Sequence, residues 1–367
     1  MTTIPSPRIL LGPGPSGVTP RVLEALGRAP IGYLDPELFT LLDSLRTNLR
    51  TLYGTSNSFT IPMTGTGMAG MESCLVNLIE PGDKDVIGVN GFFGGRQVEI
   101  ATRLGAEVTR IDGEWGKPLE AEQFAKALKG LCKVKLVGCV HAETSTGVRT
   151  PLEEIATLAH EHDALFLADM VTSLGGLPVE VDRVGVDAAY SGTQKCVGAP
   201  PGISPITASP RAWEVVQNRK SPVPNWYLDW KLLNAYYDAP HLYHHTVPVN
   251  MLFATAEALD EIVEEGLEAR FARHQSVSDR LMAGLSELGI RPFAQEGYRL
   301  PMLNSIHIPD SVTDEVAIRK RLLEEFGLEI GGGLGDLKGK IWRIGTMGAS
   351  ATERNVLLVL AALRAIL

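Results

Sequence analysis

A lysine and an aspartate, each at the end of a strand-like run, are the residues of this sequence best suited to chemistry. Lys195 closes the stretch Ser191-Gly192-Thr193-Gln194-Lys195, which follows the strand-like run 187–190 and precedes a run rich in glycine and proline. Asp169 follows the apolar run 164–168 and lies one βα unit earlier in the chain. Because parallel strands present their carboxyl ends at one edge of a sheet, both side chains are expected to point into one crevice.

Such a pair could carry out Schiff-base chemistry. Burial disfavours the charged form of a lysine and lowers its pKa, which would leave Lys195 with a free amine. A carboxylate such as Asp169 can hold a pyridinium nitrogen protonated, and this pairing suits pyridoxal 5'-phosphate. A lysine or aspartate at a strand end is also commonly a surface charge, so these two residues alone leave both interpretations open.

Length and composition restrict the class of protein. A chain of 367 residues exceeds the usual single core, so two domains are expected. Its 44% hydrophobic and 21% charged residues are typical of a globular, soluble protein. The formal net charge of −9 argues against nucleic acid and anionic membranes as partners, and no apolar run is long enough to span a bilayer.

The four cysteines and the chain ends bear on the expected compartment. The cysteines are scattered without metal-ligand spacing, so we expect no metal site and reduced core thiols. Residues 1–8 lack the charged-then-apolar form of a secretory signal, and residues 364–367 show no peroxisomal address. A cytoplasmic location is therefore expected.

Strand and helix patterns alternate at short intervals and predict a mostly parallel, doubly wound α/β sheet. Strands are expected at 59–63, 85–90, 106–111, 135–140, 164–168, 187–190 and 203–209. Helices are expected at 21–27, 37–53, 68–79, 92–104, 119–131, 152–162 and 210–220.

The remaining segments are expected to frame this sheet. Glycine and proline in 10–17 predict an irregular arm, and 223–245 is rich in Trp, Tyr, His and Pro without a clear period, which favours a functional or interface segment. The amphipathic run 251–285 predicts one long helix that links two domains. We therefore expect an arm (1–19), a large domain (20–255) and a smaller α+β domain (256–367).

Two polar clusters could contact a ligand. Thr64-Gly65-Thr66-Gly67-Met68 precedes a helix, where glycine amides and the helix dipole attract an anion, although a plain turn remains an alternative. The third glycine of a dinucleotide fingerprint is missing, so a single phosphate group fits better than a pyrophosphate. The cluster 141–147 follows a strand, and its hydroxyls suit either a ligand or an ordinary Ser/Thr turn.

Six ordered motifs together give the sequence a resemblance that extends over nearly the whole chain. They are Leu11-Gly-Pro-Gly-Pro-Ser16, Thr64-Gly-Thr-Gly67, His141-Ala-Glu-Thr-Ser-Thr-Gly147, Asp169-Met-Val-Thr-Ser-Leu-Gly-Gly176, Ser191-Gly-Thr-Gln-Lys195 with Ala199-Pro-Pro-Gly202, and Trp342-Arg-Ile-Gly345. With these motifs the sequence resembles the class V aminotransferases, which are fold-type I pyridoxal-phosphate enzymes. Within that family it is most similar to the alanine–glyoxylate and serine–pyruvate group.

The resemblance implies a large domain with a seven-stranded sheet sandwiched by helices, a smaller C-terminal domain, and a role for each residue that matches a family motif. Lys195 would form the Schiff base and shuttle the proton, and Asp169 would pair with the pyridinium nitrogen. Phe93 and Val171 would lie on the two faces of the cofactor ring, and Thr144 would lie beside the ring and the substrate. The phosphate would be held by the amides of Thr66, Gly67 and Met68 and by the Gln194 side chain. Tyr243 and Thr246 would reach the phosphate bound in a partner subunit. Arg343 would bind the substrate carboxylate through its planar fork.

The implied activity is a ping-pong transfer of an amino group from alanine or serine to glyoxylate or pyruvate, in a homodimer with shared active sites. The sequence departs from the family at Phe93, where a tryptophan is frequent, and at Met68, where some relatives have histidine. A cysteine desulfurase is disfavoured because none of the four cysteines lies in an evident mobile loop. A lyase on the same scaffold and a non-catalytic cofactor-binding protein remain as alternatives, and intact Lys195 and Asp169 favour catalysis.

Overall fold

The structure is a computed structural model that describes residues 6–367. The sequence-based interpretation of residues 1–5, as part of the arm and as lacking a secretory signal, lies outside the described residues. Within 6–367, no helix is both long enough and apolar enough to cross a membrane.

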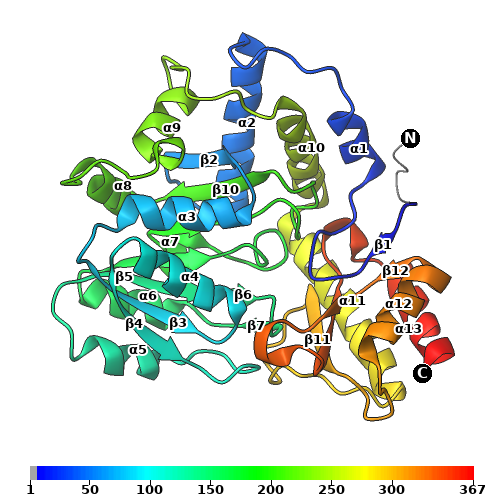
Figure 1. Cartoon of the computed structure of the whole chain (residues 1–367). Helices are drawn as coiled ribbons and strands as arrows, with labels where there is room; N and C mark the ends of the chain where they lie inside the picture. Colours follow the sequence, from blue (N-terminus) through cyan, green and yellow to red (C-terminus); the bar gives the residue numbers. More distant parts are fainter. Residues whose placement is uncertain (1–5) are drawn as a thin grey trace.

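A seven-stranded sheet in the order β2-β10-β9-β8-β5-β3-β4 organises the first part of the chain (Figure 1). Its strands are β2 (Phe59–Thr64), β3 (Lys84–Val89), β4 (Glu107–Asp112), β5 (Val134–Val140), β8 (Leu165–Asp169), β9 (Ala188–Tyr190) and β10 (Ile203–Ala208). The strands from β9 to β4 pair in parallel, whereas β10 runs antiparallel to both of its neighbours. The predicted mostly parallel α/β sheet is therefore confirmed.

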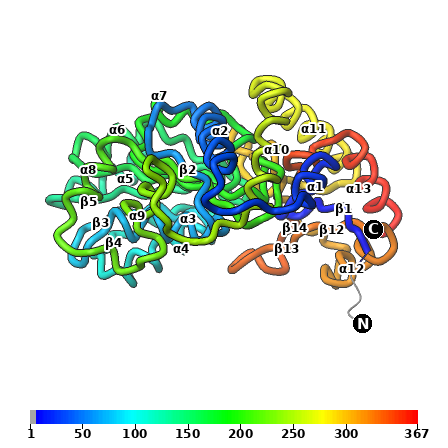
Figure 2. Tube along the Cα trace, turned by 90° about the horizontal axis from the view of Figure 1, so that it is seen from above, coloured from blue at the N-terminus to red at the C-terminus, as the bar shows by residue number. Residues whose placement is uncertain are grey.

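Helices cover both faces of this sheet, with α3 and α4 on one side and α2, α6 and α7 on the other (Figures 1 and 2). They are α2 (Pro36–Tyr53), α3 (Gly67–Leu78), α4 (Phe92–Arg103), α5 (Ala121–Leu128), α6 (Glu153–Glu161), α7 (Val181–Val184) and α8 (Pro210–Gln217). Because both faces are covered, every residue of β8 is buried, and this explains the continuous apolar run 165–168 that precedes Asp169.

Local signals set several helix ends. Helix α1 (Pro20–Leu26) begins as predicted, with the Thr19 side chain accepting from the Val22 amide and Pro20 in the first turn. Helix α2 ends at Gly54, whose φ of 61° lies in the left-handed region that glycine adopts readily.

A second, smaller core follows in the C-terminal part. Strands β11 (Leu303–His307), β14 (Ile341–Gly345) and β13 (Gly331–Gly332) form a sheet that packs with α11 (Leu267–Glu287), α12 (Glu315–Phe326) and α13 (Glu353–Ile366). Residues such as Leu281, Ile306 and Trp342 fill this core. The division at 255/256 stays a prediction; α10 (Val249–Glu265) crosses that position and packs against the first core.

One expectation about the connecting segments is wrong. The run 251–285 is two helices, α10 and α11, because Gly266 has a non-helical φ of 79° and ψ of 139°. The segment 223–245 contains α9 (Trp230–Tyr237), which begins where the Asp229 side chain accepts from the Lys231 amide. The predicted arm has no helix or strand from residue 11 to residue 17. Just before it, β1 (Ile9–Leu10) pairs in parallel with β12 (Leu328–Glu329), beside which it lies in both views.

Candidate active site

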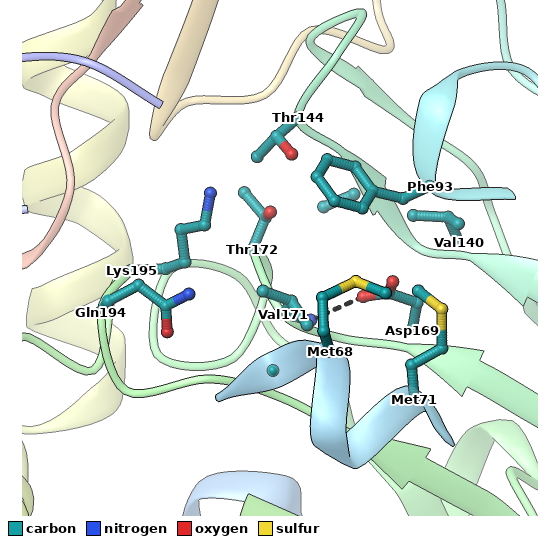
Figure 3. A pocket seen from close by; sticks show the side chains of 12 residues that line it. Met68, Met71, Phe93, Val140, Thr144, Asp169, Val171, Thr172, Gln194 and Lys195 are labelled. Atoms are coloured by element: carbon teal, nitrogen blue, oxygen red, sulfur yellow. Dashed lines mark hydrogen bonds between the residues drawn. The ribbon is translucent and has the colours of Figure 1, made fainter. Parts of the chain in front are cut away.

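A cavity lies beyond the carboxyl ends of β5, β8 and β9, between the N-termini of α3 and α4 (Figure 3). This is the edge at which parallel α/β sheets bind ligands. Its lining consists of Gly67, Met68, Met71, Phe93, Val140, Ala142, Thr144, Asp169, Val171, Thr172, Gln194 and Lys195. Eight of these twelve are residues that the sequence singles out: Gly67, Met68, Phe93, Thr144, Asp169, Val171, Gln194 and Lys195.

Asp169 is the last residue of β8, and its carboxyl group is buried. One oxygen accepts from the Val171 amide at 2.9 Å, and the other accepts from the Tyr190 hydroxyl at 2.9 Å. The Tyr190 hydroxyl in turn accepts from the Gln97 amide at 2.9 Å. Burial raises the pKa of Asp169 to about 7, while these two hydrogen bonds and the Lys195 charge oppose the rise. A cationic ring nitrogen would favour the charged form of this carboxyl group.

Lys195 lies in the turn after β9 and is covered by the N-terminal arm. Its Nζ donates to the Pro13 carbonyl, and the arm is held by Ser16, which donates its amide to the Gln194 carbonyl and its hydroxyl to the Lys195 carbonyl, both at 2.8 Å. Gly14 is required here, because its φ is 107° and a Cβ would lie 2.9 Å from Nζ. Burial, followed by the charge of Arg343, lowers the pKa of Lys195 to about 8.

The proposed phosphate turn is only partly in the cavity lining. Gly67 and Met68 begin α3 and line the cavity, whereas Thr66, the residue before the helix, is exposed and outside the lining. Helix N-termini leave their first amides without intrahelical partners, so this turn can receive an anion. Gln194 has a buried Oε1 without a partner among residues 6–367, and its Nε2 is the side-chain atom that can donate to a phosphate oxygen.

The residues assigned to the ring faces enter from different elements. Phe93 is the second residue of α4, and Val171 follows the end of β8. Figure 3 shows these two side chains on different sides of the cavity, with the Lys195 amine directed towards Thr144 and Thr172. The arrangement leaves a space bounded by apolar groups on its sides and by polar groups at its ends.

Arg343 reaches the site from the middle of β14 but is not part of the cavity lining. Its Nε donates to the Gly332 carbonyl at 2.8 Å, and its Nη1 donates to the Thr144 carbonyl at 3.1 Å. Burial lowers the pKa of Arg343 to about 10, and the charge of Glu143 opposes this fall. Among residues 6–367 no carboxylate is paired with this guanidinium, which leaves its charge available to a ligand.

Tyr243 and Thr246 are not brought to the cavity of their own chain. Both are exposed, and the Tyr243 ring packs against Tyr33 at 5.0 Å between centroids. The two histidines between them are buried, and His245 is hydrogen-bonded to the Thr64 hydroxyl at 2.8 Å. The segment that carries Tyr243 and Thr246 is thus attached to the phosphate turn, while these two side chains face outward.

Sequence reasoning missed several residues of the site. Tyr190, which directly precedes the Ser191 motif, bonds Asp169, and Glu143 lies inside the quoted 141–147 motif. The other missed lining residues are Met71, Val140, Ala142 and Thr172. Met71 lies one helical turn after Gly67, so helix spacing could have identified it.

Comparisons with known proteins identify the family. Residues 31–333 match the model described as aminotransferase class-V, and the chain therefore belongs to the class V aminotransferases. It is 39% identical to the (S)-ureidoglycine–glyoxylate transaminase of Bacillus subtilis, over 98% of this chain and 90% of that protein. It is 38% identical to the alanine–glyoxylate aminotransferase of Oryctolagus cuniculus, over 97% of this chain and 92% of that protein. The crystal structure of an alanine–glyoxylate aminotransferase from Nostoc sp. matches with a TM-score of 0.97 and 44% identity, covering 100% of this chain and 96% of that one.

The cofactor of this family is pyridoxal 5'-phosphate, and the chain is a pyridoxal-phosphate-dependent aminotransferase. The residues of the cavity fit that group. A buried carboxyl, Asp169, suits a pyridinium nitrogen, the α3 N-terminus presents amides that can receive a phosphate, and Lys195 has a lowered pKa. The expectations of fold, enzyme class and cofactor are therefore confirmed.

Proposed function

We propose that this enzyme transfers the amino group of a small amino acid, alanine or serine, to glyoxylate or pyruvate by a ping-pong mechanism. The observation that carries the proposal is the approach of Lys195, Asp169 and Arg343 to one cavity in a class V chain. The ureidoglycine relative and the alanine relative both have glyoxylate in their names, which supports glyoxylate as the first acceptor to test.

Each residue around the cavity has a proposed part in this reaction. Bound pyridoxal phosphate supplies a ring that stores the electrons left when the substrate's α-proton is removed. Lys195, with a pKa of about 8, has a substantial neutral fraction near that pH and can remove and return this proton. Asp169 stabilises the positive charge of the protonated ring nitrogen. Phe93 and Val171 pack against the two faces of the ring.

The proposed binding roles follow from where donors lie. The amides of Thr66, Gly67 and Met68, with the Gln194 side chain, hold the phosphate, and the α3 dipole favours its charge.

Arg343 binds the α-carboxylate. Its Nε and Nη1 are held by two backbone carbonyls, which fix the plane of the guanidinium and leave its remaining donors for the substrate. Thr144 lies between this arginine and the cavity.

We propose further that the active enzyme is a cytoplasmic homodimer with shared sites. Tyr243 and Thr246 face away from their own cavity, and their surroundings include Leu242, 58% exposed, and Trp226, 60% exposed. Large apolar side chains exposed together are typical of a surface that another chain covers. A second copy there would receive Tyr243 and Thr246 at its phosphate site. Four free cysteines agree with a reducing compartment.

Ureidoglycine is a second candidate donor. The relative that carries this name is 39% identical over 98% of the chain, and its crystal structure has a TM-score of 0.97. Since the alanine–glyoxylate relatives are equally similar, only activity separates the two donors.

The test is a donor-by-acceptor activity matrix on purified holoenzyme. Donors are alanine, serine, ureidoglycine and aspartate, and acceptors are glyoxylate, pyruvate and oxaloacetate. We expect the highest kcat/KM with a small donor and glyoxylate, and parallel double-reciprocal plots from the ping-pong order. Turnover with ureidoglycine alone would select the second candidate, and preference for aspartate and oxaloacetate would refute both.

A further inference from the structure

Glu143 is a fully buried carboxylate that no step above uses. It is the second residue of the short strand β6 (Ala142–Glu143), and its two oxygens accept four hydrogen bonds. Oε2 accepts from the amides of Phe93 at 3.0 Å and Gly94 at 3.3 Å, and Oε1 accepts from the Ser145 amide at 3.0 Å and its hydroxyl at 2.7 Å. All of its hydrogen-bonding capacity is directed at two backbone segments.

The first of these segments is the N-terminus of α4. Gly91, the residue before the helix, makes no side-chain cap, and a Cβ there would collide with the Glu143 Cγ and Cδ. The cap comes instead from the other segment, because the Ser145 hydroxyl accepts from the Phe92 amide at 2.8 Å. Glu143 and Ser145 together satisfy three of the helix's first amides, and the helix dipole favours the negative charge.

The residue between the two caps faces the site. The Thr144 side chain lines the cavity, and its carbonyl accepts from Arg343 Nη1. The tripeptide 143–145 therefore touches Phe93 on one side and Arg343 on the other. Its negative charge also raises the pKa values of Lys195 and Arg343 against the effect of burial.

We propose that Glu143 is a positioning residue that holds the start of α4 and the 143–145 turn together. Through these contacts it fixes Phe93 at the ring site and Arg343 at the carboxylate site relative to one another. This inference rests on the proposed roles of Phe93 and Arg343, and it predicts that one buried substitution disturbs cofactor and substrate binding at once.

The test compares Glu143→Gln with Glu120→Gln. A glutamine keeps the volume of Glu143 but directs an NH₂ group at N–H donors and leaves buried amides without an acceptor. Glu120 serves as the control for the same substitution, because it also lies at the start of a helix, α5, but its side chain is exposed and outside the cavity lining. The measurements are pyridoxal-phosphate affinity by dialysis, visible circular dichroism of the bound cofactor, KM and kcat for alanine, and melting temperature.

For Glu143→Gln we expect cofactor affinity to fall and the KM for alanine to rise, each about tenfold or more, together with a weaker visible dichroism band. Glu120→Gln should stay within about twofold of wild type in all three. A Glu143→Gln enzyme with a lower melting temperature but unchanged affinity, dichroism and KM would overturn the proposal, because the residue would then be only a helix cap.

Two further arms keep the result decisive. If Glu143→Gln does not fold, Ser145→Ala replaces it; this variant should move affinity and KM in the same direction by about threefold, and wild-type values would overturn the proposal. If the wild-type enzyme transaminates none of the substrate pairs, the proposed function fails. Cofactor affinity and dichroism would still decide whether Glu143 positions Phe93.

Discussion

Asp169→Asn should stabilise the cofactor-free enzyme at alkaline pH while it removes activity. The carboxyl group is buried at the end of β8, and its environment raises its pKa from the usual 3.8 to about 7. In the folded protein without cofactor, the charge at pH 8 is therefore held against the cost of burial. Asparagine has nearly the same shape and carries no charge.

The sign follows from proton binding by the two states. Between pH 3.8 and pH 7 the unfolded chain ionises Asp169 while the folded protein keeps the proton, so stability falls as pH rises through this window and levels off above it. The whole effect is about 4 kcal/mol at pH 8. Between pH 5 and pH 8 the free energy of unfolding of the wild type should fall by about 3 kcal/mol because of Asp169, and Asp169→Asn should not show this fall. The hydrogen-bonding cost of the amide is the same at both pH values and cancels from this difference.

The assay is urea unfolding of the cofactor-free proteins at pH 5 and pH 8, with Asp85→Asn as a matched control. Asp85 is buried in β3 and is not part of the cavity lining, both of its oxygens lack partners within residues 6–367, and burial raises its pKa to about 7. Relative to wild type, Asp85→Asn should show the same pH-dependent gain in the free energy of unfolding, and its affinity for pyridoxal phosphate should be unchanged. Asp169→Asn should bind the cofactor more weakly and lose at least about a hundredfold in kcat.

The result that would refute this reasoning is a parallel loss of stability in wild type and Asp169→Asn between pH 5 and pH 8. Burial would then not govern the ionisation of Asp169. A variant with full activity would refute its role beside the ring nitrogen.

Four other outcomes are expected. Lys195→Ala should have no measurable turnover, and a cofactor adduct found on another lysine by mass spectrometry after borohydride treatment would contradict the assignment. Arg343→Ala should lower kcat/KM for alanine at least about a hundredfold and spare an amine that lacks a carboxylate; equal losses for both would mean that it does not bind the carboxylate. Gly14→Ala places a Cβ 2.9 Å from Lys195 Nζ at a φ of 107°, so kcat should fall about tenfold or more, and wild-type turnover would show that the arm need not cover the lysine. Thr246→Ala and Tyr243→Phe should each weaken cofactor binding several-fold in a protein that sediments as a dimer, whereas a fully active monomer at assay concentration would rule out shared sites.

The sheet was predictable because its information is local. Apolar runs such as 136–140 in β5 and 165–168 in β8, separated by amphipathic helices, specify buried parallel strands without reference to distant residues. The direction of β10 was not predictable, because it depends on pairing with β2 and β9. The break at Gly266 was missed since the apolar pattern continues on both sides of it, and one backbone angle ends the helix.

The same distinction holds for the candidate site. Residue type and position at strand ends identified Lys195 and Asp169, because the ends of parallel strands converge by topology alone. The motif resemblance added residues such as Phe93, Thr144 and Gln194, which line the same cavity.

The sequence by itself determined the class of fold and the enzyme family, and it proposed Lys195 and Asp169 as the reacting pair. Only the tertiary structure decided what surrounds that pair: the Pro13 carbonyl at Lys195, the Tyr190 hydroxyl at Asp169, and Glu143 between α4 and the turn that holds Arg343. These contacts join residues far apart in the chain, and their energies depend on burial and on the directions of donors and acceptors. Neither quantity exists until the strands and helices have packed, and for that reason no local pattern encodes them.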